Sequence, residues 1–373
     1  MTSSTETRLP HPAPDFAQQD TRFARAFDIL RDSIREQAFP GASVAVTHDG
    51  RLVALKGLGR FAYGARAPEV TPESIYDLAS LTKVVATTTM AMLLYQRGLL
   101  DLDAPVFSLL PEFAANDPRR GRATVRMLLA HSSGLPAYLR LFETCHDRDD
   151  LLRAAIKTPL SAEPGARADY SDIGFIILGA LLERISGDSL ATFCDLEIFS
   201  RLGMAQTFFC PPNALRRFTP PTEDDMTFRG RSIQGEVNDE NASVMGGVAG
   251  HAGLFAPAED LARFAECMLA GGRPILQPET VVAFTTRQDS PPGASRALGW
   301  DTPSPASQSG KYFSPRSFGH LGFTGTSLWI DPERRLSVTL LTNRTWPDRK
   351  SQLIKQVRPR FHDAVVECLE GRT

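Results

Sequence analysis

Strand-forming patterns lie near both ends of this chain, and helical patterns dominate the segment between them. Near the N-terminus, residues 41–48 and 51–57 are rich in Val, Ala and Leu, and Asp49-Gly50 between them is a strong hairpin-turn signal. Near the C-terminus, residues 327–331 and 336–343 alternate as strands. This order predicts an α+β fold in which both ends contribute to one antiparallel sheet and a mostly helical region is inserted between them.

The chain has 373 residues, which is long for a single hydrophobic core. We therefore predict a sheet domain made of residues 21–75 and 245–373 and a helical domain of residues 76–244. Residues 1–20 are rich in Pro, Ser and Thr and are predicted to be a loose, flexible arm. Amphipathic helices are predicted at both ends of the sheet domain, the first ending before Pro40 and the last kinking or beginning at Pro359.

Composition excludes several classes of partner. The hydrophobic fraction is 42%, the charged fraction is 23% and the net charge is -2, so nothing indicates binding to nucleic acid. The apolar runs are too short to span a membrane, and the first ten residues lack the apolar segment of a secretory signal, so we expect a cytoplasmic location. The five cysteines are scattered, without the spacing of a disulfide framework or of a metal site.

One candidate nucleophile lies where an extended, turn-rich segment gives way to an apolar helical run. Ser80 and Lys83 are three residues apart, so they share one face of a helix that is predicted to run to about Arg97. A hydroxyl at the start of a helix lies near the positive end of its dipole, beside an amine that burial can turn into a base. A surface cap next to a solvated lysine would give the same pattern.

Three other segments admit two interpretations each. His131 lies at the predicted end of a helix that Thr124 caps, where a structural role is favoured over a catalytic one. His251 lies in a glycine-rich segment, where a hydrogen-bonded structural histidine is again the favoured interpretation. Residues 238–241 either line a site or form a surface turn.

Several short motifs together resemble the serine β-lactamase-like family, which includes class C β-lactamases, DD-peptidases and related carboxylesterases. The resemblance runs from about residue 22 over nearly the whole chain. The matching motifs, in the family's order, are Ser80-Leu-Thr-Lys83, Tyr170-Ser-Asp172 and His320-Leu-Gly322, together with Leu129-Ala-His-Ser-Ser-Gly-Leu135 and Gly322-Phe-Thr-Gly-Thr326. The resemblance implies the β-lactamase/transpeptidase-like fold, whose central antiparallel sheet is flanked by N- and C-terminal helices.

The resemblance also implies a set of roles. Ser80 would attack an acyl carbon, while Lys83 and Tyr170 would share the proton as a coupled pair. The backbone N–H groups of Ser80 and Phe323 would form the oxyanion hole. The substrate-binding residues implied are Asp172, His320, Gly322 and Thr324, and neither a metal nor another cofactor is implied.

Two departures from the family pattern bear on the substrate. His320-Leu321-Gly322 replaces the commoner Lys-Thr-Gly, so a permanent cation and a hydroxyl that would bind a substrate carboxylate are lost. Asp172 replaces the commoner Asn, so an amide donor is replaced by an acceptor that favours the charged form of Lys83. The first change favours neutral esters over penicillin-like carboxylates.

The sequence therefore predicts a metal-free serine hydrolase that acts through an acyl-enzyme on a small acyl substrate, with carboxylesterase activity favoured and weak β-lactamase activity left open. The alternatives are a D-amino-acid peptidase or DD-carboxypeptidase, and a catalytically silent homologue that binds peptidoglycan-like peptides or assembles with itself. The chain has neither the Gly-x-Ser-x-Gly motif of α/β-hydrolases nor a His-Glu-x-x-His zinc motif. The oligomeric state is left open.

Overall fold

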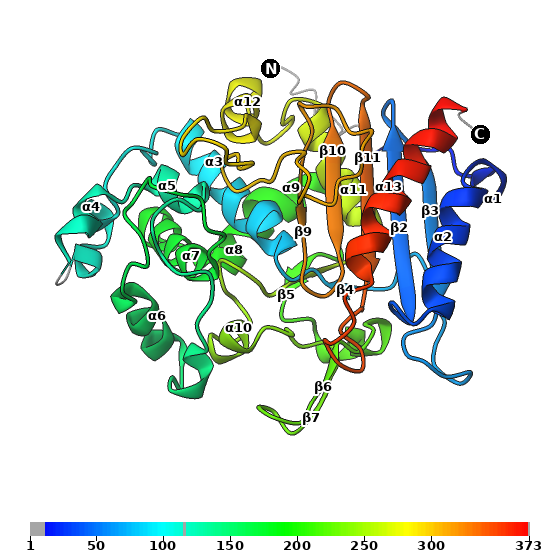
Figure 1. The fold of residues 1–373 in the computed structure, drawn as a ribbon, viewed down its shortest axis with the longest axis horizontal. Coiled ribbons are helices and arrows are strands. Elements are labelled where there is room, and N and C mark those ends of the chain that lie inside the picture. Colours follow the sequence, from blue (N-terminus) through cyan, green and yellow to red (C-terminus); the bar gives the residue numbers. More distant parts are fainter. Residues whose placement is uncertain (1–11, 115–116, 372–373) are drawn as a thin grey trace, which may run out of the picture.

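The computed structural model describes residues 12–114 and 117–371. Its centre is a six-stranded sheet with the strand order β1-β3-β2-β11-β10-β9 (Figure 1). Neighbouring strands are antiparallel except for the parallel pair of β1 and β3. The strands are β1 (Ala13–Pro14), β2 (Gly41–His48), β3 (Arg51–Gly59), β9 (Phe318–Leu321), β10 (Ser327–Asp331) and β11 (Leu336–Thr342).

The two ends of the chain meet in the middle of this sheet. Strand β2 pairs with β11 over seven residue pairs, from Ala42 opposite Thr342 to His48 opposite Leu336. The predicted hairpin is also confirmed, because Asp49 and Gly50 adopt φ angles of 51° and 73° and connect β2 to β3. A two-residue hairpin turn of this kind requires positive φ at both positions, which Asp and Gly tolerate.

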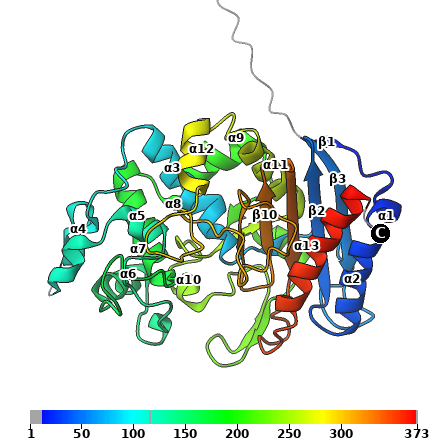
Figure 2. The same ribbon diagram turned by 45° about the horizontal axis from the view of Figure 1, so that its top comes forward.

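Helices cover both faces of the sheet. Helices α2 (Ala24–Arg35) and α13 (Ile354–Glu370) lie on one face, and α11 (Ala258–Leu269) lies on the other (Figures 1 and 2). Apolar side chains of α2 and α13, such as Phe27 and Phe361, belong to one buried cluster with the sheet. Pro359 lies inside α13, in its second turn.

The region beside the sheet is mostly helical, as Figure 2 shows. Its short helix α5 is capped as predicted, since the Thr124 hydroxyl accepts a hydrogen bond from the Met127 amide. The remaining α-helices of the described residues are α1 (Gln19–Arg22), α3 (Thr89–Gln96), α4 (Val106–Leu109), α5 (Val125–Leu129), α6 (Arg148–Lys157), α7 (Asp172–Ser186), α8 (Leu190–Cys194), α9 (Ser200–Leu202), α10 (Glu240–Val244) and α12 (Pro278–Thr285).

Two small sheets complete the fold. The first has the order β4-β8-β5 and joins the segment before Ser80 to the glycine-rich segment that contains His251. The second is the hairpin of β6 and β7, which projects at the bottom of Figure 1. Their strands are β4 (Tyr76–Asp77), β5 (Phe208–Phe209), β6 (Glu223–Asp225), β7 (Arg231–Ile233) and β8 (Leu254–Ala256).

The predicted division of the chain differs from the structure at its start. Residues 12–20 were expected to belong to a loose arm, but Ala13–Pro14 pair with β3 and Gln19 begins helix α1. Residues 1–11 of that arm lie outside the described residues. The division into a sheet domain and a helical domain stays a prediction, and one continuous hydrophobic cluster contains residues of both, such as Ala45 and Leu178.

Candidate active site

Ser80 lies in a tight turn between strand β4 and the following helical segment. Ala79 has a positive φ of 47°, and its amide donates to the Asp77 carboxylate at 2.8 Å. The helical segment differs from the regular α-helix that the sequence predicts, because Lys83–Thr88 form a π-helix before α3 begins. Short π-helical segments widen a helix and occur frequently at functional sites.

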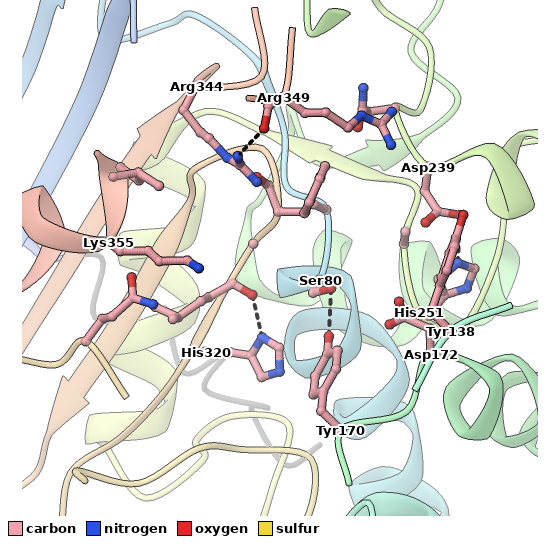
Figure 3. A pocket seen from close by; sticks show the side chains of 18 of the residues that line it. Ser80, Tyr138, Tyr170, Asp172, Asp239, His251, His320, Arg344, Arg349 and Lys355 are labelled. Carbon is pink, nitrogen blue, oxygen red and sulfur yellow. Dashed lines mark hydrogen bonds and ion pairs between the residues drawn. The ribbon is translucent and has the colours of Figure 1, made fainter. Parts of the chain in front are cut away.

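The structure brings Ser80, Lys83 and Tyr170 together. Lys83 Nζ is 2.9 Å from Ser80 Oγ. The Tyr170 hydroxyl donates to the same oxygen at 2.8 Å, as Figure 3 shows. Tyr170 precedes helix α7, and it is 90 residues from Ser80 in the sequence. A hydroxyl in contact with both an amine and a phenol has the geometry of an activated nucleophile.

The Lys83 amine is fully buried and has two hydrogen-bond acceptors and one ion-pair partner. Besides Ser80 Oγ, these are the backbone carbonyl of His251 at 2.9 Å and the Asp172 carboxylate at 2.7 Å. Burial opposes the charge on Lys83, but the Asp172 carboxylate and Tyr170 outweigh it, so the pKa of the amine is raised. The two hydrogen bonds and the ion pair together favour the charged form of the amine.

Tyr170 also rests in its protonated form, which for a phenol is neutral. Burial raises the pKa of its phenol above the ordinary value, and the neighbouring Lys83 only partly offsets this effect. The resting pair at neutral pH is therefore an ammonium and a neutral phenol. The Tyr170 ring packs against His131 at 4.6 Å between centroids, and the Arg296 guanidinium lies 5.4 Å from its centroid.

His131 has a structural environment. Its ring is buried between Tyr170 and Phe175, and its Nδ1 accepts a hydrogen bond from the Ser171 amide at 2.9 Å. Burial and the nearby cations hold its pKa well below the ordinary value, so the ring is neutral. His131 thus orients the Tyr170–Ser171 segment and does not contact Ser80.

The candidate oxyanion donors lie on the edge of the pocket. Phe323 follows β9 in the turn to β10, and both Phe323 and Ser80 line the pocket. Among the described residues, neither the Ser80 amide nor the Phe323 amide has a hydrogen-bond partner in the protein. Gly322 is required there because a Cβ would lie 2.6 Å from the Leu78 carbonyl oxygen and would also overlap the Thr326 hydroxyl.

The predicted substrate-binding residues divide into two groups. Asp172, His320 and Gly322 line the pocket. Thr324 does not, because its buried hydroxyl donates to the Asp77 carbonyl at 2.8 Å. The role predicted for Thr324 in substrate binding stays a prediction, and its side chain ties the β9–β10 turn to the segment before Ser80.

His320 does not replace the cation of the commoner motif. Its ring is buried, its Nδ1 is 2.8 Å from the Leu321 carbonyl, and its centroid is 5.8 Å from that of Tyr170. Burial, Lys83 and Arg296 hold the pKa of His320 well below its ordinary value, so the ring is neutral. Its Nδ1 therefore donates to the Leu321 carbonyl.

Residues 238–240 and His251, for which the sequence left two interpretations, both lie at the pocket. Asn238, Asp239 and Glu240 line the pocket. The His251 ring is buried and lies 2.9 Å from the Asp239 carboxylate, while the His251 carbonyl accepts from Lys83. The acidic side of the pocket, with Asp172, Asp239 and His251, lies to the right of Ser80 in Figure 3.

A set of cations that lines the same pocket was missed in the sequence. The pocket has a volume of about 680 Å³, and its basic residues are Arg296, Arg344, Arg349, Lys355 and Arg358. Four of these follow β11 in segment 344–358, for which the sequence predicted no pocket role. Arg349 is paired with Glu223 and Glu240, whereas Lys355 has no carboxylate partner among the described residues.

The described part of the chain contains no group of three or more His, Cys, Asp or Glu side chains placed to hold a metal ion. Within the same residues, no helix is long and apolar enough to cross a membrane.

Comparison with known proteins gives consistent matches over most of the chain. A family model described as Beta-lactamase matches residues 23–358. The chain is 31% identical to an N-acetylmuramyl-L-alanine amidase of Bacillus subtilis (strain 168), covering 88% of this chain and 82% of that protein. It is also 31% identical to a putative D-alanyl-D-alanine carboxypeptidase of Salmonella paratyphi B, covering 90% of this chain and 86% of that protein.

Among solved structures, the chain is similar to EstCE1, a hydrolase with promiscuous acyltransferase activity. The TM-score is 0.73 at 22% sequence identity, with 93% of this chain and 99% of that chain covered. The two proteins therefore share the same fold.

Proposed function

The chain belongs to the Beta-lactamase family, whose members are serine hydrolases, and from this premise we propose that Ser80 is the nucleophile of an acyl-enzyme mechanism. The observation that carries the proposal is the pair of contacts at Ser80 Oγ, 2.9 Å from Lys83 Nζ and 2.8 Å from the Tyr170 hydroxyl. Two titratable groups on one hydroxyl suit nucleophilic attack on an ester or amide carbonyl.

The proton chemistry follows from the resting state. An ammonium and a neutral phenol cannot accept the Ser80 proton, so the reactive form of the Lys83–Tyr170 pair carries one proton fewer. In that form the pair takes the proton of Ser80 as Oγ bonds to the acyl carbon, and it returns the proton to the leaving group as the ester or amide bond breaks. Water then attacks the acyl-Ser80 ester with the same pair as base, which releases the acid and restores Ser80.

The negative oxygen that forms in both steps would be stabilised by the amides of Ser80 and Phe323, which have no other partner among the described residues. Each such donor contributes about 3 kcal/mol of transition-state stabilisation in comparable sites. Asp172, His320 and Gly322 would border the bound acyl group from the pocket wall.

We favour ester substrates. The neutral, buried His320 stands where a cation would bind the carboxylate of a penicillin or a peptide C-terminus, so turnover of such compounds through that contact should be weak. The similarity in fold to EstCE1 is compatible with this preference.

A second candidate is a D-amino-acid peptidase or DD-carboxypeptidase. Two relatives at 31% identity carry the names of an amidase and a putative carboxypeptidase. Lys355 also lines the pocket without a carboxylate partner among the described residues, so a carboxylate could bind there instead of at position 320. A silent homologue that only binds peptides or assembles with itself would have no need of the Ser80 contacts.

The test compares the wild type with Ser80→Ala on p-nitrophenyl esters, a chromogenic cephalosporin and D-Ala-D-Ala peptides. Mass spectrometry after exposure to a fluorophosphonate should show one adduct on Ser80 of the wild type and none on the variant. Ester hydrolysis faster than peptide release supports the favoured substrate class, and the reverse order supports the peptidase. Equal inactivity of both proteins on all substrates, without an adduct, would overturn the enzymatic proposal.

A further inference from the structure

The buried guanidinium of Arg358 binds the turn that carries the candidate oxyanion donor. Arg358 lies on helix α13 and is only 4% exposed. It donates to the Gly322 carbonyl at 2.7 Å and to the Thr326 carbonyl at 2.9 Å, the residues that begin and end the β9–β10 turn. Gly322 and Thr326 are joined by a backbone hydrogen bond of 2.7 Å, so the guanidinium closes the base of that turn.

Arg358 is a cation without a nearby anion. Its other side-chain partner is the amide oxygen of Gln308 at 3.0 Å, and within the described residues no carboxylate pairs with it. Burial and the neighbouring Arg344 lower its pKa to about 9, so it remains charged at neutral pH. Its positive charge is therefore balanced by backbone carbonyl dipoles.

One of those carbonyls, that of Gly322, belongs to the peptide group whose N–H is the candidate oxyanion donor. The Gly322 carbonyl and the Phe323 N–H are the two ends of a single peptide group, and a cation bound to the oxygen draws electron density away from the nitrogen. The N–H becomes a stronger donor, as hydrogen bonds in a chain polarise one another. Arg344 Nε binds the Phe323 carbonyl at 2.7 Å, so the turn is held on both sides of that amide.

Resting on the acyl-enzyme function proposed above, we propose that Arg358 is a positioning residue that fixes and polarises the Gly322–Phe323 peptide as an oxyanion donor. Arg358 itself does not touch the reacting atoms. Its effect grows as negative charge develops on the substrate oxygen, so it lowers the transition state more than the bound substrate.

The alternative is that Arg358 merely ties α13 to the sheet, and His362 supplies a matched control. One helical turn further along α13, the buried His362 is 3.2 Å from Ser327 Oγ on β10 and 3.0 Å from the Gln308 carbonyl. It therefore joins the same helix to the same sheet without contacting the Gly322–Phe323 peptide.

The experiment measures kcat and KM for a neutral p-nitrophenyl ester in wild type, Arg358→Gln, Arg358→Lys and His362→Gln. It also measures the affinity for phenylboronic acid, which forms a tetrahedral, negatively charged adduct with a nucleophilic serine. We expect Arg358→Gln to lower kcat and boronate affinity together by roughly tenfold, with KM changing by less than about twofold. Arg358→Lys should recover part of both losses, and His362→Gln should change neither by more than about twofold even if it unfolds at a lower temperature.

The inference is overturned if Arg358→Gln folds and keeps wild-type kcat and boronate affinity, or if His362→Gln loses both to the same degree. If Arg358→Gln does not fold, Arg358→Lys is the deciding variant. A lysine keeps the charge but makes fewer hydrogen bonds, so an intermediate kcat supports the inference and a wild-type kcat overturns it. Failure of the underlying function is distinguishable, since the wild type itself would then neither hydrolyse the ester nor form an adduct at Ser80.

Discussion

The Lys83 amine lies 2.7 Å from the carboxylate of Asp172, which stands where the commoner family motif has asparagine. This contact stabilises the ammonium and also raises the pKa of Tyr170 by like-charge repulsion of the phenolate. The pKa values of Lys83 and Tyr170 are therefore higher than they would be with an uncharged asparagine at position 172.

Asp172→Asn should shift the acid limb of the kcat/KM profile to lower pH. The carboxylate raises the pKa values of both Lys83 and Tyr170, so its removal lowers the pH at which the pair loses the proton that blocks attack. The pH profile of p-nitrophenyl ester hydrolysis measures this shift. An acid limb that stays in place or moves to higher pH would contradict the assigned role of Asp172.

Tyr170→Phe should reduce kcat/KM by about 100- to 10,000-fold, because the ring contacts with His131 remain while the hydroxyl on Ser80 is lost. The same ester assay measures the loss, and circular dichroism checks that the fold is kept. Tyr95→Phe is the control, since Tyr95 packs on Phe284 away from the pocket. Near-wild-type turnover by Tyr170→Phe would remove the phenol from the mechanism.

Gly322→Ala should damage both stability and turnover. The added methyl group would lie 2.6 Å from the Leu78 carbonyl oxygen, so the turn that carries the Phe323 amide must move. Overpacking of this kind costs about 1–3 kcal/mol of unfolding free energy, measured by denaturant titration. Gly64→Ala should be nearly neutral, because nothing lies within 4 Å of its added Cβ. Equal stability and kcat in both variants would argue against a constrained oxyanion turn.

Lys355→Ala should discriminate between substrates by charge. If this amine, which has no carboxylate partner within residues 12–114 and 117–371, receives a substrate carboxylate, the variant loses about five- to tenfold in kcat/KM for a carboxylate-bearing ester and keeps its rate on the uncharged analogue. Lys350→Ala is the matched control, because Lys350 is paired with exposed Asp348 and does not line the pocket. The same loss on both esters would exclude a charge-specific role for Lys355.

Local sequence patterns predicted much of the fold. The Asp49-Gly50 turn, the strands that it joins and the Thr124 cap were all predicted correctly, since each depends on residues that are neighbours in the chain. The regular helix expected after Ser80 was wrong in detail, because the π-helix of Lys83–Thr88 is buried and its packing overrides the local preference.

The composition of the pocket depended on tertiary contacts. Thr324 is predicted to bind the substrate, and the structure shows its hydroxyl bound to the Asp77 carbonyl, 247 residues away in the sequence. The guanidinium of Arg358 reaches the site from a segment that carries no motif pointing to it. The carbonyl of His251 reaches it from the glycine-rich segment, for which the sequence favoured a purely structural role. Directions of side chains in turns follow from packing and not from residue spacing.

Ser80 and Lys83 illustrate what the sequence predicts and what only the tertiary structure shows. The sequence alone predicted that they lie together, because a spacing of three residues at the start of a helix brings two side chains to one face, and the 2.9 Å contact agrees with this although Ser80 lies in the turn before the helix. Only the tertiary structure shows that the Lys83 amine also contacts the Asp172 carboxylate and the His251 carbonyl. Only the tertiary structure shows that burial and nearby cations keep His320 neutral. Those properties depend on burial and on charges from distant segments, which the order of residues along the chain does not reveal.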